Sequence, residues 1–175
     1  GRPFKAVKYA TDITAAKLQN ADHEGQISAV NRSMAVIEFD LDGTIRTANA
    51  NFLAAVGYRL DEVQGQHHRM FVEPTYGRSA EYLAFWERLA RGEYIRDEFQ
   101  RFGKGGRSIW IQASYNPIMG ADGRPFKVVK YATDVTSRVR TRLAIRDLSA
   151  ELADASEELT AVAGRLANSA DASLS

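Results

Sequence analysis

One segment of the chain occurs twice, and this duplication most limits how the chain can be organised. Residues 1–14 read GRPFKAVKYATDIT and residues 123–136 read GRPFKVVKYATDVT, so twelve of the fourteen positions are identical and both differences exchange apolar residues. Such identity at an offset of 122 residues, about one domain length, is typical of tandem domains. We therefore predict that residues 1–14 are the last strand of a preceding domain copy, and that residues 34–136 form a complete copy within a longer protein. The alternative is a strand duplicated locally within one domain.

Composition narrows the classes of protein to which the chain can belong. Its 175 residues provide room for one ordinary domain plus an extension. The 23 Lys and Arg residues nearly cancel the 22 Asp and Glu residues, which gives no support to a nucleic-acid or anionic-lipid partner. The sequence has no cysteine, so disulfides, thiolate-bound metals and a cysteine–flavin adduct are excluded. Because it shows neither a long apolar run nor a signal peptide, we expect a cytoplasmic protein without a membrane segment in this chain.

A helical pattern follows each copy of the duplicated segment. Residues 15–33 have a loose apolar face and are predicted to form a connecting helix. Residues 137–175 show a cleaner pattern, because apolar residues recur in alternating steps of three and four. This spacing is typical of a coiled coil, and a single amphipathic helix that packs on its own domain is the alternative. The predicted seam consists of Ile145, Leu148, Leu152, Ala155, Leu159, Val162 and Leu166.

The region between the two helices mixes short strands with short helices. Apolar runs separated by Asp-Gly and Gly-rich turns predict strands, and apolar stripes closed by glycine predict helices. Hairpin turns make the sheet antiparallel, so the expected fold class is α+β rather than a doubly wound parallel sheet. The predicted strands span residues 35–40, 44–48, 94–102, 108–117 and 125–135, and the predicted helices span 50–56, 61–63 and 79–91.

One short motif suggests an enzyme. Residues 36–45, VIEFDLDGTI, resemble the first motif of haloacid-dehalogenase-type phosphatases, in which Asp40 would be the nucleophile and Asp42 the general acid. That chemistry also needs a phosphate-binding lysine, further acidic Mg²⁺ ligands and a parallel sheet, whereas the pattern after Thr44 predicts hairpins. We therefore expect no enzyme and no catalytic residue, and keep the phosphatase as a remote alternative. Asp42-Gly43 is interpreted as a hairpin turn.

Two further features carry competing interpretations. Aromatic residues crowd residues 52–110, where they could line a pocket for a flat ligand or fill the core of a small domain, and spacing alone does not choose. The adjacent pair His67-His68 is a poor metal chelate, because neighbouring side chains point in different directions, so no metal site is predicted. One of the two could bind haem or another cofactor, and the favoured interpretation is a polar loop histidine.

The motifs of residues 35–136 resemble, in order, those of a PAS domain. The resemblance is to PAS domains of bacterial methyl-accepting chemotaxis proteins, including soluble receptors with tandem PAS domains. The ending Asp134-Val135-Thr136 is similar to the Asp-Ile-Thr at which such domains pass into a signalling helix. The matching segments are FDLDG at 39–43, NANF at 49–52, GY at 57–58, LDEVQG at 60–65, FWERL at 85–89, GE at 92–93, KGG at 104–106, WIQA at 110–113, NPI at 116–118, DG at 122–123 and KVVKYATDVT at 127–136.

This resemblance implies a sensory input module with the PAS fold, in which a five-stranded antiparallel sheet carries helices on one face and encloses a cavity. It implies no catalysis. Members of the family bind FAD, haem, small metabolites or nothing, so the cofactor stays open. His68 is similar to a histidine of FAD-binding aerotaxis receptors. Trp110, Gln112 and Ser114 are expected on the opposite face of the sheet. By comparison with flavin-binding relatives, the expected cofactor-binding residues are His68, Phe71, Phe85, Trp86, Phe99, Arg101, Ile111 and Ala113.

The resemblance also implies how a signal leaves the domain. A ligand or redox change in the cavity would shift the sheet and pass through Asp134, Val135 and Thr136 to a dimeric coiled coil at residues 137–175. The expected partners are a second copy, held through the PAS faces and the coiled coil, and a chemotaxis kinase or adaptor reached through an output domain beyond this chain. The alternatives are a ligand-free dimerisation or relay module and the PAS sensor of a histidine kinase or diguanylate cyclase.

Overall fold

A computed structural model describes residues 13–173 of the chain, with side chains described up to residue 165. Its five strands form one antiparallel sheet in the order β2-β1-β5-β4-β3, so the predicted α+β fold is confirmed. Residues 1–12 of the predicted preceding strand, and the side chain of Leu166, lie outside the described part. The strands are β1 (Ala35–Phe39), β2 (Ile45–Ala48), β3 (Ile95–Phe102), β4 (Ser108–Met119) and β5 (Pro125–Asp134). The helices are α1 (Thr14–Ser33), α2 (Ala50–Val56), α3 (Leu60–Val63), α4 (Ala80–Ala90) and α5 (Thr136–Ser173), with 3₁₀ turns η1 (His68–Phe71), η2 (Tyr76–Arg78) and η3 (Lys104–Gly106).

The turn between β1 and β2 depends on an aspartate and a glycine. Asp42 Oδ1 accepts a hydrogen bond from Thr44 N at 2.9 Å. Gly43 has a φ of 92°, which glycine adopts without strain, and a Cβ at this position would lie 2.8 Å from Trp86 Cε2. Both the backbone conformation and the available space therefore require glycine here. Since the sheet is antiparallel and Asp42 accepts this turn hydrogen bond, the phosphatase alternative lacks the parallel sheet that it requires.

Two asparagines join the start of α2 to the end of α1. Asn49 Oδ1 accepts hydrogen bonds from Phe52 N at 2.9 Å and from Val36 N at 3.0 Å, and therefore caps α2 and fixes the start of β1. Its Nδ2 donates to Met34 O at 2.9 Å. Asn51 Nδ2 donates to the same carbonyl at 3.1 Å. Both amides thus donate to the carbonyl of Met34, the residue that follows the last turn of α1, where carbonyl groups lack partners within the helix.

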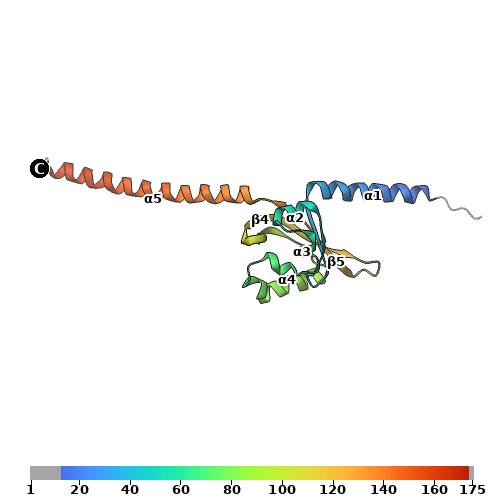
Figure 1. Ribbon diagram of the computed structural model, residues 1–175. Helices are drawn as coiled ribbons and strands as arrows, with labels where there is room; N and C mark the ends of the chain where they lie inside the picture. The colour runs from blue at the N-terminus through green and yellow to red at the C-terminus, as the bar shows by residue number, and fades with distance from the viewer. Residues whose placement is uncertain (1–12, 174–175) are drawn as a thin grey trace, which may run out of the picture.

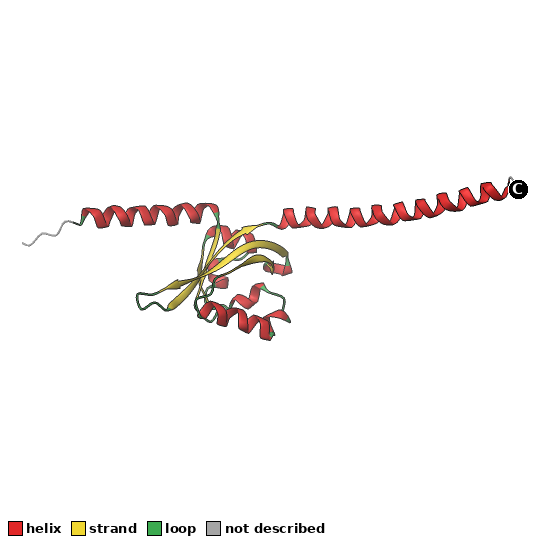
Figure 2. Ribbon diagram, turned by 180° about the vertical axis from the view of Figure 1, so that it is seen from behind, coloured by secondary structure: helices red, strands yellow, loops and turns green. Residues whose placement is uncertain are grey.

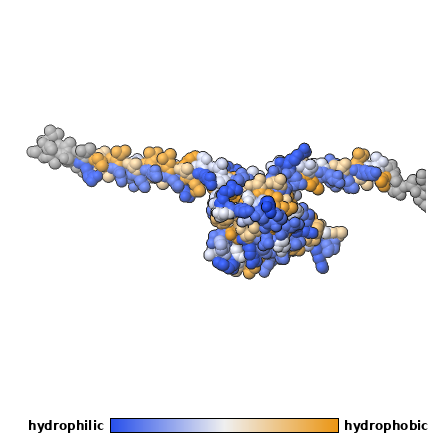
Figure 3. Space-filling model, in the orientation of Figure 1, coloured by the Kyte–Doolittle hydropathy of each residue, from blue (hydrophilic) through white to orange (hydrophobic). Residues whose placement is uncertain are grey.

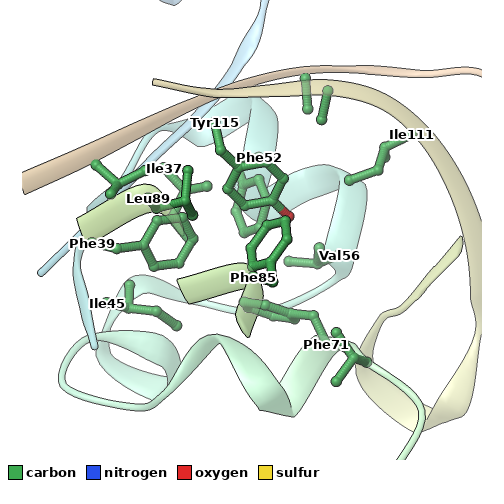
Figure 4. Close-up of a cluster of buried hydrophobic side chains, with 14 of the residues drawn as sticks. Ile37, Phe39, Ile45, Phe52, Val56, Phe71, Phe85, Leu89, Ile111 and Tyr115 are labelled. Carbon is green, nitrogen blue, oxygen red and sulfur yellow. The ribbon is translucent and has the colours of Figure 1, made fainter. Parts of the chain in front are cut away.

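The core lies between the inner face of the sheet and helices α2, α3 and α4 (Figure 2). On β4 the side chains of Ile109, Ile111, Ala113 and Tyr115 are buried, and those between them are partly exposed. Successive strand side chains point to opposite faces, so this alternation fixes the inner face. Figure 4 shows residues of the sheet and helices meeting in this core, with the Tyr115 hydroxyl directed into it.

The two flanking helices leave the domain from neighbouring strands. Ala35, at the start of β1, pairs with Ala132, near the end of β5. Because these strands are antiparallel, the end of α1 and the start of α5 lie at the same end of this strand pair. From there the two helices extend in opposite directions (Figure 1). The chain therefore enters and leaves the domain at neighbouring positions.

Helix α5 has little contact with the rest of the described chain. Val139 is buried, whereas every side chain from Arg140 to Arg165 is exposed. The alternative of a single helix packed on its own domain is therefore wrong for this segment. Apolar residues gather along one side of α5 (Figure 3). No helix within residues 13–173 combines the length and the apolar character needed to cross a membrane.

Candidate ligand cavity and signal exit

His68, at the start of η1, is completely buried. Its Nδ1 lies 2.8 Å from the hydroxyl of Tyr82 on α4, and its Nε2 lies 3.0 Å from the hydroxyl of Tyr115 on β4. The interpretation as a polar loop histidine is therefore wrong for His68. The neighbouring His67 is half-buried and caps η1, where its Nδ1 accepts a hydrogen bond from Arg69 N at 3.1 Å. The two adjacent histidines thus have different environments.

The direction of the buried hydrogen bonds follows from Arg101 on β3. Arginine can only donate, and Arg101 Nη2 donates to the Tyr115 hydroxyl at 3.1 Å. Arg101 cannot accept the single proton of this hydroxyl, whereas His68 Nε2 can, so the hydroxyl donates to Nε2. The histidine proton is then on Nδ1, where it forms the hydrogen bond to Tyr82. Such a histidine is neutral. Burial, with smaller effects of Arg101, Lys130 and His67, holds the pKa of His68 well below its usual value, in agreement with this assignment.

Lys130 is a further buried basic residue, located on β5 and only 1% exposed. Its Nζ lies 4.7 Å from the ring centroid of Tyr115 and 5.7 Å from that of Phe52. Burial, and then the nearby Arg101, hold the pKa of Lys130 well below the usual range for lysine. The sequence analysis missed this residue. The alternation of side chains along β5 could have indicated its burial, because Val128, Lys130 and Ala132 lie on the same, inner face of the strand.

A small cavity of about 10 Å³, room for about one water molecule, lies between α2 and the inner faces of β4 and β5. It extends from the buried Lys130 to the exposed Asp134. Most of its lining is apolar, and the charged residues are Arg101, Lys130 and Asp134. The lining residues are Ala35, Phe52, Ala55, Val56, Phe71, Arg101, Ile109, Ile111, Lys130, Ala132 and Asp134.

The sequence-predicted cofactor residues divide into two groups in this structure. Phe71, Arg101 and Ile111 line the cavity. The others surround it as part of the interior: His68, Phe85, Trp86 and Ala113 are buried, and Phe99 is partly buried with its ring 5.5 Å from that of Tyr115. Tyr82 and Tyr115, which position His68, were not predicted because neither residue carries a local motif.

The residues around His68 do not fit haem or FAD in the arrangement described. A haem ligand needs a ring nitrogen free to bind iron, whereas both nitrogens of His68 are hydrogen-bonded to tyrosines. Aromatic rings contact His68 on several sides, for example Phe39 and Trp86, each with its ring centroid 5.4 Å away. The cavity of about 10 Å³ is far below the range for ligand pockets, so neither haem nor FAD has room in this arrangement.

The exit from the domain is a short hydrogen-bonded junction. Asp134 Oδ1 accepts from Thr136 N at 2.8 Å, and Thr136 Oγ1 accepts from Trp110 N at 2.9 Å. Val135 N donates to Trp110 O at 2.8 Å. The predicted relay residues therefore connect the end of β5 to β4 and to the first turn of α5.

Two ion pairs extend this junction along α5. Glu98 on β3 accepts from Arg138 and from Arg142, each at 2.9 Å, through its two carboxylate oxygens. Both arginines lie near the start of α5 and occupy successive turns of the helix. They hold α5 against the edge of the sheet that carries β3.

The family model described as the PAS fold matches residues 29–140. This chain belongs to the PAS family. Among solved structures, this PAS chain is similar to an RNA-binding light-oxygen-voltage receptor, with a TM-score of 0.57 and 24% identity over 86% of the chain and 40% of the receptor. A PAS domain from Colwellia psychrerythraea also has a TM-score of 0.57, at 20% identity, and covers 66% of this chain and 98% of that domain. At this identity the two structures support the fold alone.

Two curated proteins are related in sequence to this PAS chain. The biofilm dispersion protein BdlA of Pseudomonas aeruginosa is 45% identical over 163 residues, which cover 93% of this chain and 39% of that protein. The aerotaxis receptor of Escherichia coli is 30% identical over 111 residues, which cover 63% of this chain and 20% of the receptor. The chain therefore spans well under half the length of either relative.

Proposed function

We propose that this PAS chain is the sensory input module of a cytoplasmic chemotaxis receptor, and that it transmits the state of its cavity to a dimeric coiled coil formed by α5. One observation supports this proposal most directly. Lys130, Ala132 and Asp134 line the cavity and lie on β5, the strand that continues into α5 at Thr136. A change in the cavity therefore acts on the strand that leads to the output. The similarity to an aerotaxis receptor supports the same function.

The exposed stripe of α5 supports a second copy of this chain as the partner. Leu148 is 66% exposed, and Leu152 and Leu159 are each 70% exposed. Leucines at heptad spacing are costly to leave in water, and a facing helix with the same stripe would bury them. In this proposal the dimer passes the signal to a chemotaxis kinase or adaptor through an output domain.

Sedimentation of a charged double variant tests the dimer. Leu152→Asp with Leu159→Asp places two carboxylates on the seam, so the variant is expected to sediment as a monomer at concentrations where the wild type is dimeric. The matched control is Ala150→Asp with Ala153→Asp, which adds the same charge to exposed positions off the seam. This control is expected to remain a dimer. A seam variant that dimerises like the wild type would contradict the coiled coil and point to contacts between PAS faces.

A further inference from the structure

The first turns of α5 continue its heptad stripe with polar residues. Arg138 lies one heptad before Ile145, and Thr141 lies one heptad before Leu148, so both occupy positions of the predicted seam. Their side chains are exposed. An open groove follows the same side of the helix, and its lining residues are Ser137, Arg138, Thr141, Arg142 and Ile145. The surface that a second α5 would cover therefore begins at the first turn of the helix, next to the domain.

An arginine on the seam is unfavourable unless its charge is compensated. In a parallel pair of helices each seam residue faces its own copy, so two Arg138 guanidinium groups would approach each other across the interface. Both stay charged, because arginine does not lose its proton in proteins. Like charges placed opposite each other in an interface weaken it. A dimer that includes the first turns of α5 therefore needs an anionic group beside each Arg138.

Glu98 on β3 supplies that anionic group. Its Oε1 accepts from Arg138 Nη2 and its Oε2 accepts from Arg142 Nη2, each at 2.9 Å. Arg142 lies one turn after Arg138 and beside the seam rather than on it, so Glu98 approaches α5 from the flank. Thr141 stays exposed on the other side of the seam. The hydrogen bond from Arg142, and then that from Arg138, hold the pKa of Glu98 below its usual value, which keeps this carboxylate charged at neutral pH.

The position of Glu98 relative to α5 depends on the sheet. Glu98 is paired with Gln112 on β4, and Gln112 is paired with Thr133 on β5, directly before the exit junction. The first turn of α5 is attached to β4 and β5, because Val139 is buried and Thr136 Oγ1 accepts from Trp110 N. Glu98 alone extends from β3 to the helix with ion pairs. A shift of β3 relative to β5 therefore changes the distance between Glu98 and the two arginines.

We propose that a second copy of this chain packs against α5 from its first turn, and that Glu98 keeps this part of the dimer closed by neutralising Arg138 on the seam. This inference rests on the proposed dimer and names the contact that regulates it. Movement of β3 away from α5 breaks the ion pairs and leaves like charges facing each other between the two helices. The dimer then opens beside the domains, while the leucines further along α5 keep the rest of it closed.

Disulfide cross-linking of the full chain tests this proposal, because the sequence has no cysteine of its own. Thr141→Cys reports the seam beside the domain, and Ala155→Cys reports the same heptad position further along α5. Both should cross-link under mild oxidation, whereas Ala150→Cys, on the opposite side of the helix, should not. Glu98→Gln should slow cross-linking at position 141 at least about fivefold and leave position 155 unchanged, because only the first turns carry the uncompensated arginines.

Two further variants separate the charge of Glu98 from a general effect on the fold. Glu93→Gln is the matched control, because Glu93 also pairs with two arginines, Arg88 and Arg91, at the end of α4. It should leave both cross-linking rates unchanged. Adding Arg138→Leu to Glu98→Gln should restore cross-linking at position 141, because an apolar residue on the seam needs no anionic group beside it. Circular dichroism establishes that each variant is folded.

Four results would overturn the role of Glu98. These are no cross-link at position 141 in a chain that keeps Glu98, an unchanged rate there in Glu98→Gln, an equal loss at positions 141 and 155, or no recovery with Arg138→Leu. If position 155 of the chain that keeps Glu98 cross-links in such a case, the coiled coil stands and only the Glu98 contact is rejected. Absence of a cross-link at both positions of that chain rejects the dimer itself.

Discussion

The hydroxyl of Tyr115 lies 3.0 Å from Nε2 of His68, in the middle of a buried chain of hydrogen bonds from Arg101 to Tyr82. This hydroxyl both accepts from Arg101 and donates to His68. Residues on β3, β4, η1 and α4 are joined in this way inside the core. The free energy of unfolding should therefore depend on the hydroxyl oxygen of Tyr115. Its variation with pH should reflect the neutral state of His68.

Replacement of Tyr115 by Phe removes that oxygen and leaves His68 Nε2 buried without a partner. We expect the free energy of unfolding to fall by about 1–3 kcal/mol, the cost of an unsatisfied buried polar group. Urea denaturation measures the change. Tyr94→Phe is the control, because Tyr94 is 69% exposed and its hydroxyl should contribute little. Equal stability of Tyr115→Phe and Tyr94→Phe would argue against the hydrogen-bonded chain.

Acidification should destabilise the protein through His68. Its folded-state pKa is lowered well below 6.5, mainly by burial, so the unfolded chain binds a proton first as the pH falls. The free energy of unfolding should therefore be insensitive to this group above pH 6.5. Below that pH it should decrease by up to about 1.4 kcal/mol per pH unit for the one proton.

The surroundings of His68 act in the same direction. The basic groups nearest to it, Arg101 and Lys130, both oppose a positive charge on the histidine. Tyr82 and Tyr115 stay neutral in this pH range because burial raises the pKa of each. His67 also has a lowered pKa, from partial burial, and adds a smaller dependence of the same sign. His68→Met should flatten most of the acid limb in denaturation from pH 4.5 to 7. An unchanged limb would mean that His68 is not neutral and buried in solution.

Lys130→Met should make the protein more stable at pH 7. Lys130 loses either its proton or its hydration on burial, so replacing it by an apolar side chain of similar size is expected to raise the free energy of unfolding by about 1–4 kcal/mol. The folded-state pKa of Lys130 is lowered, so the unfolded chain holds more protons and wild-type stability should rise with pH until the unfolded pKa of about 10.4. The variant should lack this rise between pH 7 and 9. Lys127→Met, which removes a partly exposed ion pair, should shift stability by less than about 1 kcal/mol.

Gly43→Ala should destabilise the domain by about 1–3 kcal/mol, because alanine at a φ of 92° is strained and its Cβ would approach Trp86 and His67 within 3 Å. Thermal unfolding measures the effect. Gly25→Ala is the matched control in α1, where a Cβ would meet nothing within 4 Å. That change should be neutral or slightly stabilising, since alanine favours helix more than glycine does. Similar losses in both variants would contradict the local explanation.

Much of the fold was predictable because its signals are local. The alternation of β4, the Asp42-Gly43 turn and the heptad spacing of α5 each depend on residues that are close in sequence. The predicted antiparallel sheet and its helices followed from these patterns. The duplicated segment also marked the junction with α5, because its second copy ends at Thr136, the first residue of that helix.

The environment of the polar residues was decided by tertiary structure. His68 meets Tyr115 across 47 positions of sequence, and long-range packing of this kind makes the expected loop histidine a buried, neutral one. In the sequence Lys130 looks like an ordinary basic residue of a strand. It is buried because α2 packs over the inner face of β5. Periodicity and turn preferences are encoded in neighbouring residues, so the sequence by itself determined the sheet, the turns and the heptad stripe. Burial and hydrogen-bond partners depend on residues far apart in the chain, so only the folded structure revealed that Lys130 and Arg101 are buried beside one small cavity.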